Sequence, residues 1–149
     1  MMTWARATTL ETVRNLSIEQ LDFLMDDKSN SIGALLLHIA AIETAYQTDT
    51  FENRLFNEAE TGQWGAALEL GDKARQEIRG YSLQDYITIL KDVRQKTLNG
   101  LQERHDDWLY IVSDWWGHKP ANHYFKWVHV MEDEISHRGQ MRIIKKYFA

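Results

Sequence analysis

The chain has 149 residues, enough for one domain with a sizeable core, and we expect a single domain over residues 1–149. Its formal charge is -5 with acidic and basic residues interspersed, so we expect no basic surface that would bind nucleic acid. Cysteine is absent, which excludes disulfides and thiolate metal sites, so any metal must be held by histidine and carboxylate side chains.

The N-terminal segment lacks the features of an export signal. Residues 1–6 contain no charged segment followed by an apolar run. No stretch approaches the ~18 apolar residues that a membrane span needs. We therefore expect a cytoplasmic protein without a membrane partner.

The first part of the chain has helical periodicity. Apolar residues recur at steps of three in residues 3–16: Trp4, Ala7, Leu10 and Val13. Ser17 and Gln20 resemble a capping box that opens a short extension through Met25. Ser31 is a suitable N-cap for a second helix over residues 32–46, which is apolar almost all round. Such a helix is expected to be buried on more than one side.

Residues 51–80 have mixed polarity and four glycines, so they predict a long connection with one short helix near residues 66–78. Ser82 and Asp85 resemble another helix start, and apolar residues at spacings of three and four continue this helix to about Arg104.

The remaining segments predict one break and one long helix. The segment 105–120 is rich in tryptophan and ends with Gly117 and Pro120, which break regular structure before a last helix over residues 122–148. No segment alternates apolar and polar residues for long enough to predict a sheet. The pattern predicts an all-α protein, a four-helix bundle.

The last helix carries polar groups on its apolar side. At about 100° per residue, Asp133 lies about 40° from His137 around the helix axis. Four apolar residues also lie within about 40° of His137: Val130, Met141, Ile144 and Phe148. Burying an unpaired carboxylate is costly, whereas side chains one turn apart can share a cation that offsets the cost. The spacing therefore predicts a bound metal ion.

The second helix offers a third ligand. His38 shares a helix face with residues that are mostly small: Ala34, Leu35, Ala41, Ile42 and Ala45. Together, His38, Asp133 and His137 would form a set of two histidines and one carboxylate, which leaves coordination positions open as in a catalytic site. Zinc, nickel, iron and manganese all accept such ligands.

Simpler interpretations exist for each residue. His38 alone fits a hydrogen-bonded core histidine, and His137 with Asp133 fits a buried salt bridge. The occurrence of both on separate helices favours the metal. His129 lies about 80° from His137, so it is either a further ligand or a partly exposed histidine.

We expect no role at the metal site for the other polar residues in or near these helices. We expect no specific role for the histidines in or beside the loop, His105, His118 and His123. Arg138 and Gln140 are expected to face solvent or to cap the helix.

A second apolar stripe on the last helix points away from the predicted metal: Tyr124, Val128, Met131 and Ile135. One helix cannot bury both sides against one core, so either residues 51–80 or a second subunit must cover this stripe. We expect a two-fold homodimer.

Two segments resemble a known family. Residues 31–43 and 137–140 are similar to the two signature helices of the DinB/YfiT-like proteins, and length and helix order agree over nearly the whole chain. The resemblance implies an up-down-down-up four-helix bundle, often dimeric. It also implies a divalent metal, commonly nickel or zinc, bound by one histidine on the second helix and two on the last, one turn apart.

His38 matches the first of these ligands and His137 the last, whereas Asp133 stands where the family usually has its middle histidine. The site is therefore either a triad of two histidines and one carboxylate or a site that has lost its metal. Family members with known activity include transferases and isomerases that use bacillithiol or mycothiol.

Two functions follow from the resemblance. The first is a metal-dependent enzyme, of transferase or hydrolase type, with a small-molecule substrate and a low-molecular-weight thiol; Glu134 or His129 would carry protons there. The second is a non-catalytic dimeric protein, stress-related or ligand-binding, in which the metal site has degenerated.

Overall fold

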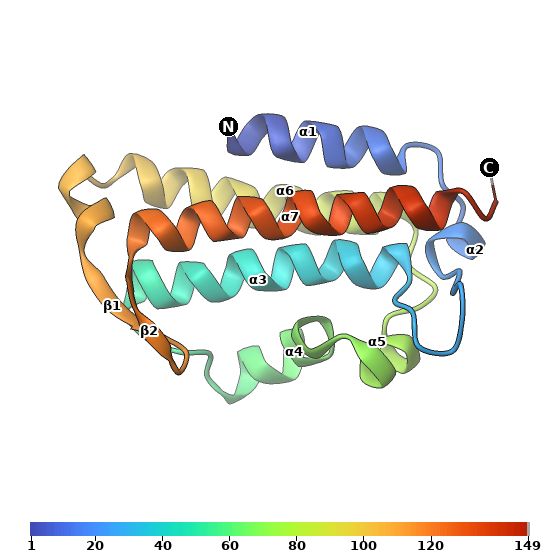
Figure 1. Ribbon diagram of the computed structural model, residues 1–149, viewed down its shortest axis with the longest axis horizontal. Coiled ribbons are helices and arrows are strands. Elements are labelled where there is room, and N and C mark those ends of the chain that lie inside the picture. The colour runs from blue at the N-terminus through green and yellow to red at the C-terminus, as the bar shows by residue number, and fades with distance from the viewer. Residues whose placement is uncertain (149) are drawn as a thin grey trace.

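The computed structural model describes residues 1–148 and consists mainly of four long helices packed side by side (Figure 1). These helices are α1 (Met2–Val13), α3 (Ile32–Glu52), α6 (Leu83–Gln102) and α7 (His123–Lys145). In Figure 1, α1 and α7 run in one direction and α3 and α6 in the other. The all-α, up-down-down-up bundle is therefore confirmed.

The helices begin where the sequence places capping residues. The Ser31 hydroxyl accepts a hydrogen bond from the backbone N–H of Ala34 at 3.1 Å, at the start of α3. Complete capping boxes open α6 at Ser82 and the short helix α2 (Ile18–Leu21) at Ser17. Each cap satisfies backbone N–H groups that have no partner inside the helix, so it fixes the helix start.

Helix α3 is the centre of the fold because it packs against α6, α7 and the connection that follows it. Most of its residues are buried, as its continuous apolar sequence predicted. Gly33 allows α6 to approach, since a Cβ at this position would lie 2.4 Å from the Tyr86 hydroxyl. This helix extends to Glu52, six residues beyond the predicted end.

The connection 51–80 is more regular than expected. It contains two helices, α4 (Glu58–Glu69) and α5 (Gly71–Glu77), where one helix near residues 66–78 was predicted. A capping box at Asn57 starts α4 despite the glycines that follow. The two helices meet at Leu70 and Gly71, whose φ angles of 56° and 63° are left-handed, so α4 cannot continue into α5.

Residues 105–122 contain a sheet that the sequence analysis did not predict. A 3₁₀ helix η1 (Asp106–Tyr110) precedes an antiparallel hairpin of β1 (Val112–Trp115) and β2 (His118–Asn122). The strands are too short to show alternation, and Gly117 and Pro120 were interpreted as breakers. Both strands of a two-stranded hairpin are edge strands, however, and edge strands tolerate proline.

A buried lysine anchors the hairpin to the bundle. The side chain of Lys126 on α7 is fully buried, and its ammonium group donates to Asp49 Oδ2 at 2.8 Å and to Ser113 Oγ at 2.9 Å. It also donates to the carbonyl oxygen of Asp114. These bonds join α3, α7 and β1, so the hairpin is held against one end of the two helices.

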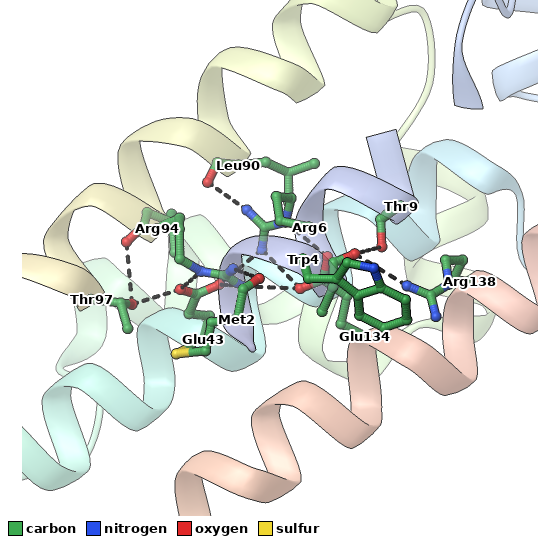
Figure 2. Close-up of polar contacts among 12 residues, drawn as sticks. Met2, Trp4, Arg6, Thr9, Glu43, Leu90, Arg94, Thr97, Glu134 and Arg138 are labelled. Carbon is green, nitrogen blue, oxygen red and sulfur yellow. Dashed lines mark hydrogen bonds and ion pairs between the residues drawn. The ribbon is translucent and has the colours of Figure 1, made fainter. Parts of the chain in front are cut away.

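A charge network crosses the centre of the bundle (Figure 2). Arg6 of α1 donates to Glu134 Oε1 of α7 and to Glu43 Oε2 of α3, both at 2.9 Å. Arg94 of α6 donates to Glu43 Oε1 at 2.7 Å and to Glu134 Oε2 at 3.0 Å. All four residues are buried. Two guanidinium groups and two carboxylates balance one another and connect all four long helices.

Two other residues differ from expectation. His123 lies beside the loop as expected, in the first turn of α7, but it has a packing role: it is buried, and its ring lies on Trp108 with centroids 4.3 Å apart. Arg138 is also buried, and its guanidinium donates to the Ala5 carbonyl at 3.2 Å and to Thr8 Oγ1, so it joins α7 to α1 instead of facing solvent. Within residues 1–148, no helix combines the length and hydropathy needed to cross a membrane.

Candidate metal centre

Three predicted side chains converge between α3 and α7. His38 comes from α3, while Asp133 and His137 lie one turn apart on α7. One ligand atom from each residue lies within 4.8 Å of the other two. The Nε2 atoms of His38 and His137 lie 3.8 Å and 3.3 Å from Asp133 Oδ1, respectively. The structure therefore brings the three predicted ligands together.

Hydrogen bonds at the far side of each ring orient both imidazoles. His38 Nδ1 lies 2.7 Å from the carbonyl oxygen of Ala67 in α4. A carbonyl oxygen only accepts, so Nδ1 donates to it, and this bond turns Nε2 toward Asp133. His137 Nδ1 lies 3.3 Å from Gln140 Oε1 and is oriented in the same way. Histidines that bind metals usually have such a partner at the second nitrogen.

The carboxylate of Asp133 is charged and incompletely satisfied. Burial alone would raise the pKa of Asp133, but hydrogen bonds and charge from His137 and His38 outweigh this effect and hold the pKa below its ordinary value. Its Oδ2 atom is buried and has no hydrogen-bond partner among the described residues. A buried, unpartnered carboxylate oxygen is costly, and a cation beside it would remove that cost.

The donor set fits a divalent transition metal. Two imidazole nitrogens and one carboxylate oxygen are ligands that zinc, nickel, iron and manganese accept. Three protein ligands leave at least one coordination position for a small molecule. The burial of His137 alone would lower its pKa, but the neighbouring Asp133 outweighs this effect and raises it. Metal binding therefore competes with a proton at His137.

The other two predicted site residues lie outside this cluster. Glu134 points into the network with Arg6 and Arg94, which corrects the expectation that it carries protons at the metal centre. It lies next to Asp133 in sequence but about 100° away around the helix. His129 is partly exposed and lies 3.3 Å from Glu132 Oε2 through its Nδ1.

Comparison with known proteins identifies the family. The family model described as mycothiol-S-transferase matches residues 1–148. The chain belongs to this family. No curated protein sequence matches the chain.

Two solved structures resemble this mycothiol-S-transferase family member. A DinB-like protein from Bacillus cereus ATCC 10987 is 16% identical with a TM-score of 0.73, over 98% of this chain and 87% of that chain. A conserved protein from Enterococcus faecalis is 16% identical with a TM-score of 0.74, over 97% of this chain and 91% of that chain. At this identity the likeness concerns the fold alone. The DinB-like resemblance inferred from the signature segments is confirmed.

Tyr46 of this mycothiol-S-transferase family member places a hydroxyl group about two helical turns after His38 on α3. Its oxygen accepts a hydrogen bond from Trp115 Nε1 at 2.8 Å, and its ring packs on Trp116 with centroids 4.5 Å apart. Burial raises the pKa of Tyr46 to about 12, the Trp115 hydrogen bond opposes the shift, and the charges of Asp49 and Asp133 add to it. The hydroxyl is therefore protonated at neutral pH. The sequence pattern did not point to Tyr46, because it did not predict the hairpin whose Trp115 and Trp116 contact this residue.

An apolar groove begins one helical turn from His38 on α3. Its volume is about 410 Å³, and its lining comes from α3, the α4 segment and the hairpin turn: Ile42, Ala45, Thr48, Leu55, Phe56, Thr61, Leu68 and Trp116. Ile42 lies one helical turn after His38, and Leu68 follows Ala67, whose carbonyl binds His38. None of these lining residues is charged.

Proposed function

We propose that this protein is a divalent-metal-dependent thiol S-transferase of the cytoplasm, with His38, Asp133 and His137 as the metal ligands. The observation that carries the proposal is the convergence of two oriented imidazoles on Oδ1 of the Asp133 carboxylate, whose other oxygen, Oδ2, is buried without a hydrogen-bond partner among the described residues. Nickel or zinc is the metal we expect, with iron or manganese as alternatives. The cytoplasm suits this activity because low-molecular-weight thiols are kept reduced there.

A metal ion at these ligands supplies a Lewis acid that lowers the pKa of a thiol or water at its open position. The protein residues prepare the site for this chemistry. The Ala67 carbonyl and Gln140 hold the two imidazoles in the orientation that binds a cation. With Asp133 as a ligand, the metal-loaded site carries one positive charge fewer than a site with three neutral histidines. It therefore stabilises a bound thiolate less strongly than such a site would.

S-transfer joins the sulfur of a thiol to an electrophilic atom of a second substrate, and the thiol proton must leave the site. Glu134 is held by Arg6 and Arg94, so of the two expected proton carriers only His129 remains. His129 lies beside Trp115, with ring centroids 5.6 Å apart, at the partly exposed rim. Mycothiol is the thiol suggested by the family name, and bacillithiol is the alternative.

Metal content tests the proposal first. Protein purified without an affinity tag should contain close to one equivalent of a divalent metal, and the His38→Ala variant should lose it. The loaded protein should then transfer mycothiol to an electrophile, and a chelator should abolish this transfer. Absence of metal from both proteins after incubation with nickel and zinc would remove the proposal.

A non-catalytic ligand-binding protein is the second candidate. Asp133 at the position of the usual family histidine favours it, because a changed ligand set is expected where a metal reaction has been lost. Equal inactivity of metal-loaded and chelated protein with both mycothiol and bacillithiol would support this second function.

We also infer that the protein forms a two-fold homodimer through α7. Three side chains of its outer stripe, Tyr124, Val128 and Ile135, are exposed by 53%, 38% and 42%. The segment with α4 and α5 packs along α3 and does not cover these residues, which removes the alternative that residues 51–80 bury the stripe. Exposed apolar stripes of this kind are typical of protein interfaces.

A further inference from the structure

The turn of the hairpin presents an unusual residue. Trp116 and Gly117 form a two-residue loop between the strands, with left-handed φ angles of 43° and 82°. Such type I′ turns favour asparagine, aspartate or glycine at the first position, because a larger side chain is strained there. Turn formation therefore does not explain a tryptophan at position 116.

The indole of Trp116 instead forms part of the apolar groove. One side of the ring system packs on Tyr46, yet the residue remains 40% exposed. Figure 1 shows the hairpin descending past the end of α3 toward the start of α4. Trp116 lines the groove together with Leu55 and Phe56, which precede α4. The strained turn thus places a large apolar surface opposite α4.

The groove begins one helical turn from His38, although none of the three candidate ligands lines it. Ile42 follows His38 by one turn on α3, so both side chains lie on the same helix face. On the other side, Leu68 lines the groove directly after Ala67, which bonds His38. A molecule in contact with Ile42 therefore lies one helical turn, about 5.4 Å along α3, from His38. The groove's volume of about 410 Å³ suits a small molecule.

We propose that this groove binds the second substrate of the transfer, an uncharged and predominantly apolar electrophile, and that Trp116 determines selectivity for it. The inference rests on the proposed thiol S-transferase function. The lining carries no charged group that would pair with an ionic substrate, and its polar side-chain groups are the hydroxyls of Thr48 and Thr61 and the indole N–H of Trp116. An ionic electrophile would lose its hydration there without compensation.

The transfer step can be written for a probe of this class, 1-chloro-2,4-dinitrobenzene. The thiolate sulfur attacks the ring carbon that carries chlorine, and a sulfur–carbon bond forms. The carbon–chlorine bond breaks, and chloride leaves with the bonding electron pair. The thiol proton passes to the buffer, with His129 as its proposed carrier. The products are the aryl thioether, chloride and a proton, and no external oxidant or reductant is needed.

Binding can be measured without any reaction. The inert analogue 1,3-dinitrobenzene, added to metal-loaded protein without thiol, should shift the methyl NMR signals of Ile42, Leu55 and Leu68. In the Trp116→Asn variant this affinity should fall on the order of tenfold, because the stacking surface is lost. Asparagine suits the type I′ turn, so the hairpin is retained. Tyr110→Ala, which removes an aromatic side chain that is 67% exposed and outside the groove, is the matched control and should bind normally.

Kinetics should show the same selectivity. In Trp116→Asn, KM for 1-chloro-2,4-dinitrobenzene should rise on the order of tenfold, while KM for the small polar electrophile chloroacetamide and for mycothiol should change less than about twofold. Methyl shifts without any thiol transfer would support the groove and overturn the proposed function. Two results would overturn the proposed role of the groove and leave the proposed function intact. One is thiol transfer without methyl shifts, and the other is an equal rise of KM for both electrophiles in Trp116→Asn.

Discussion

His38 and Ala67 are joined by a hydrogen bond of 2.7 Å that links a candidate metal ligand on α3 to the backbone of α4. This bond decides which nitrogen of His38 faces Asp133. The α4 segment lies in a region that sequence analysis described mainly as a connection. It therefore contributes directly to the site, because a ligand ring fixed in advance loses less freedom when a cation binds.

Replacement of Asp133 by histidine should preserve the proposed metal site. We expect Asp133→His to bind zinc and nickel, because two histidines one turn apart on a helix converge on one cation. Asp133→Ala should weaken binding by a factor on the order of 100 or more, since one of three ligands is lost. Competitive titration with a chromophoric chelator measures both affinities. Wild-type affinity in Asp133→Ala would show that this carboxylate is not a ligand.

Gln140 should contribute to metal affinity although it does not belong to the ligand cluster. Its Oε1 accepts from His137 Nδ1, so Gln140→Ala should weaken zinc binding about tenfold without changing the free energy of unfolding by more than about 0.5 kcal/mol. Gln95→Ala on α6 is the matched control, because it removes an exposed glutamine whose side chain bonds Asn99 and no other residue among 1–148. Equal affinities in the two variants would contradict this role of Gln140.

Glu134 should be a structural residue. Glu134→Ala leaves Arg6 and Arg94 with a missing partner in the core, and we expect the free energy of unfolding to fall by about 3 to 5 kcal/mol in urea titration. Glu69→Ala, at an exposed ion pair with Lys73, should cost about 0 to 1 kcal/mol. A small effect for Glu134→Ala would argue against the network as a source of stability.

Glu134 should also make the free energy of unfolding depend on pH in the acid range. Burial would raise the pKa of Glu134, but Arg6 and Arg94 outweigh it and depress the pKa in the folded protein. Its stabilising contribution is therefore complete above the ordinary pKa of 4.5 and is lost as pH falls from there toward the folded pKa. Urea midpoints between pH 7 and pH 3 should fall less steeply in Glu134→Gln than in the wild type.

Disruption of the outer stripe of α7 should produce monomers. Val128→Glu places a charge on a surface that the homodimer proposal buries, so light scattering after gel filtration should give the mass of one chain, about 17.5 kDa. Ile18→Glu, at an exposed apolar residue on α2, should leave the dimer intact. A wild-type protein that is already monomeric at micromolar concentration would exclude this interface.

The helices could be predicted because their determinants are local. Capping residues such as Ser31 and Ser82 fix helix starts through bonds that span three residues. The spacing of Asp133 and His137 likewise places both on one face of α7 whatever surrounds the helix. The sequence by itself therefore determined the bundle, two of the three candidate ligands as a pair, and the family to which the segments belong.

Only the tertiary structure decided which partners each polar side chain contacts. Asp133 faces His38, whereas the adjacent Glu134 faces Arg6 and Arg94, and these partners lie up to 128 residues away along the chain. The hairpin, the Ala67 bond and the groove beside Trp116 also depend on contacts between distant segments. Periodicity defines the face of a single helix, but packing determines which groups from other helices fill the space in front of it.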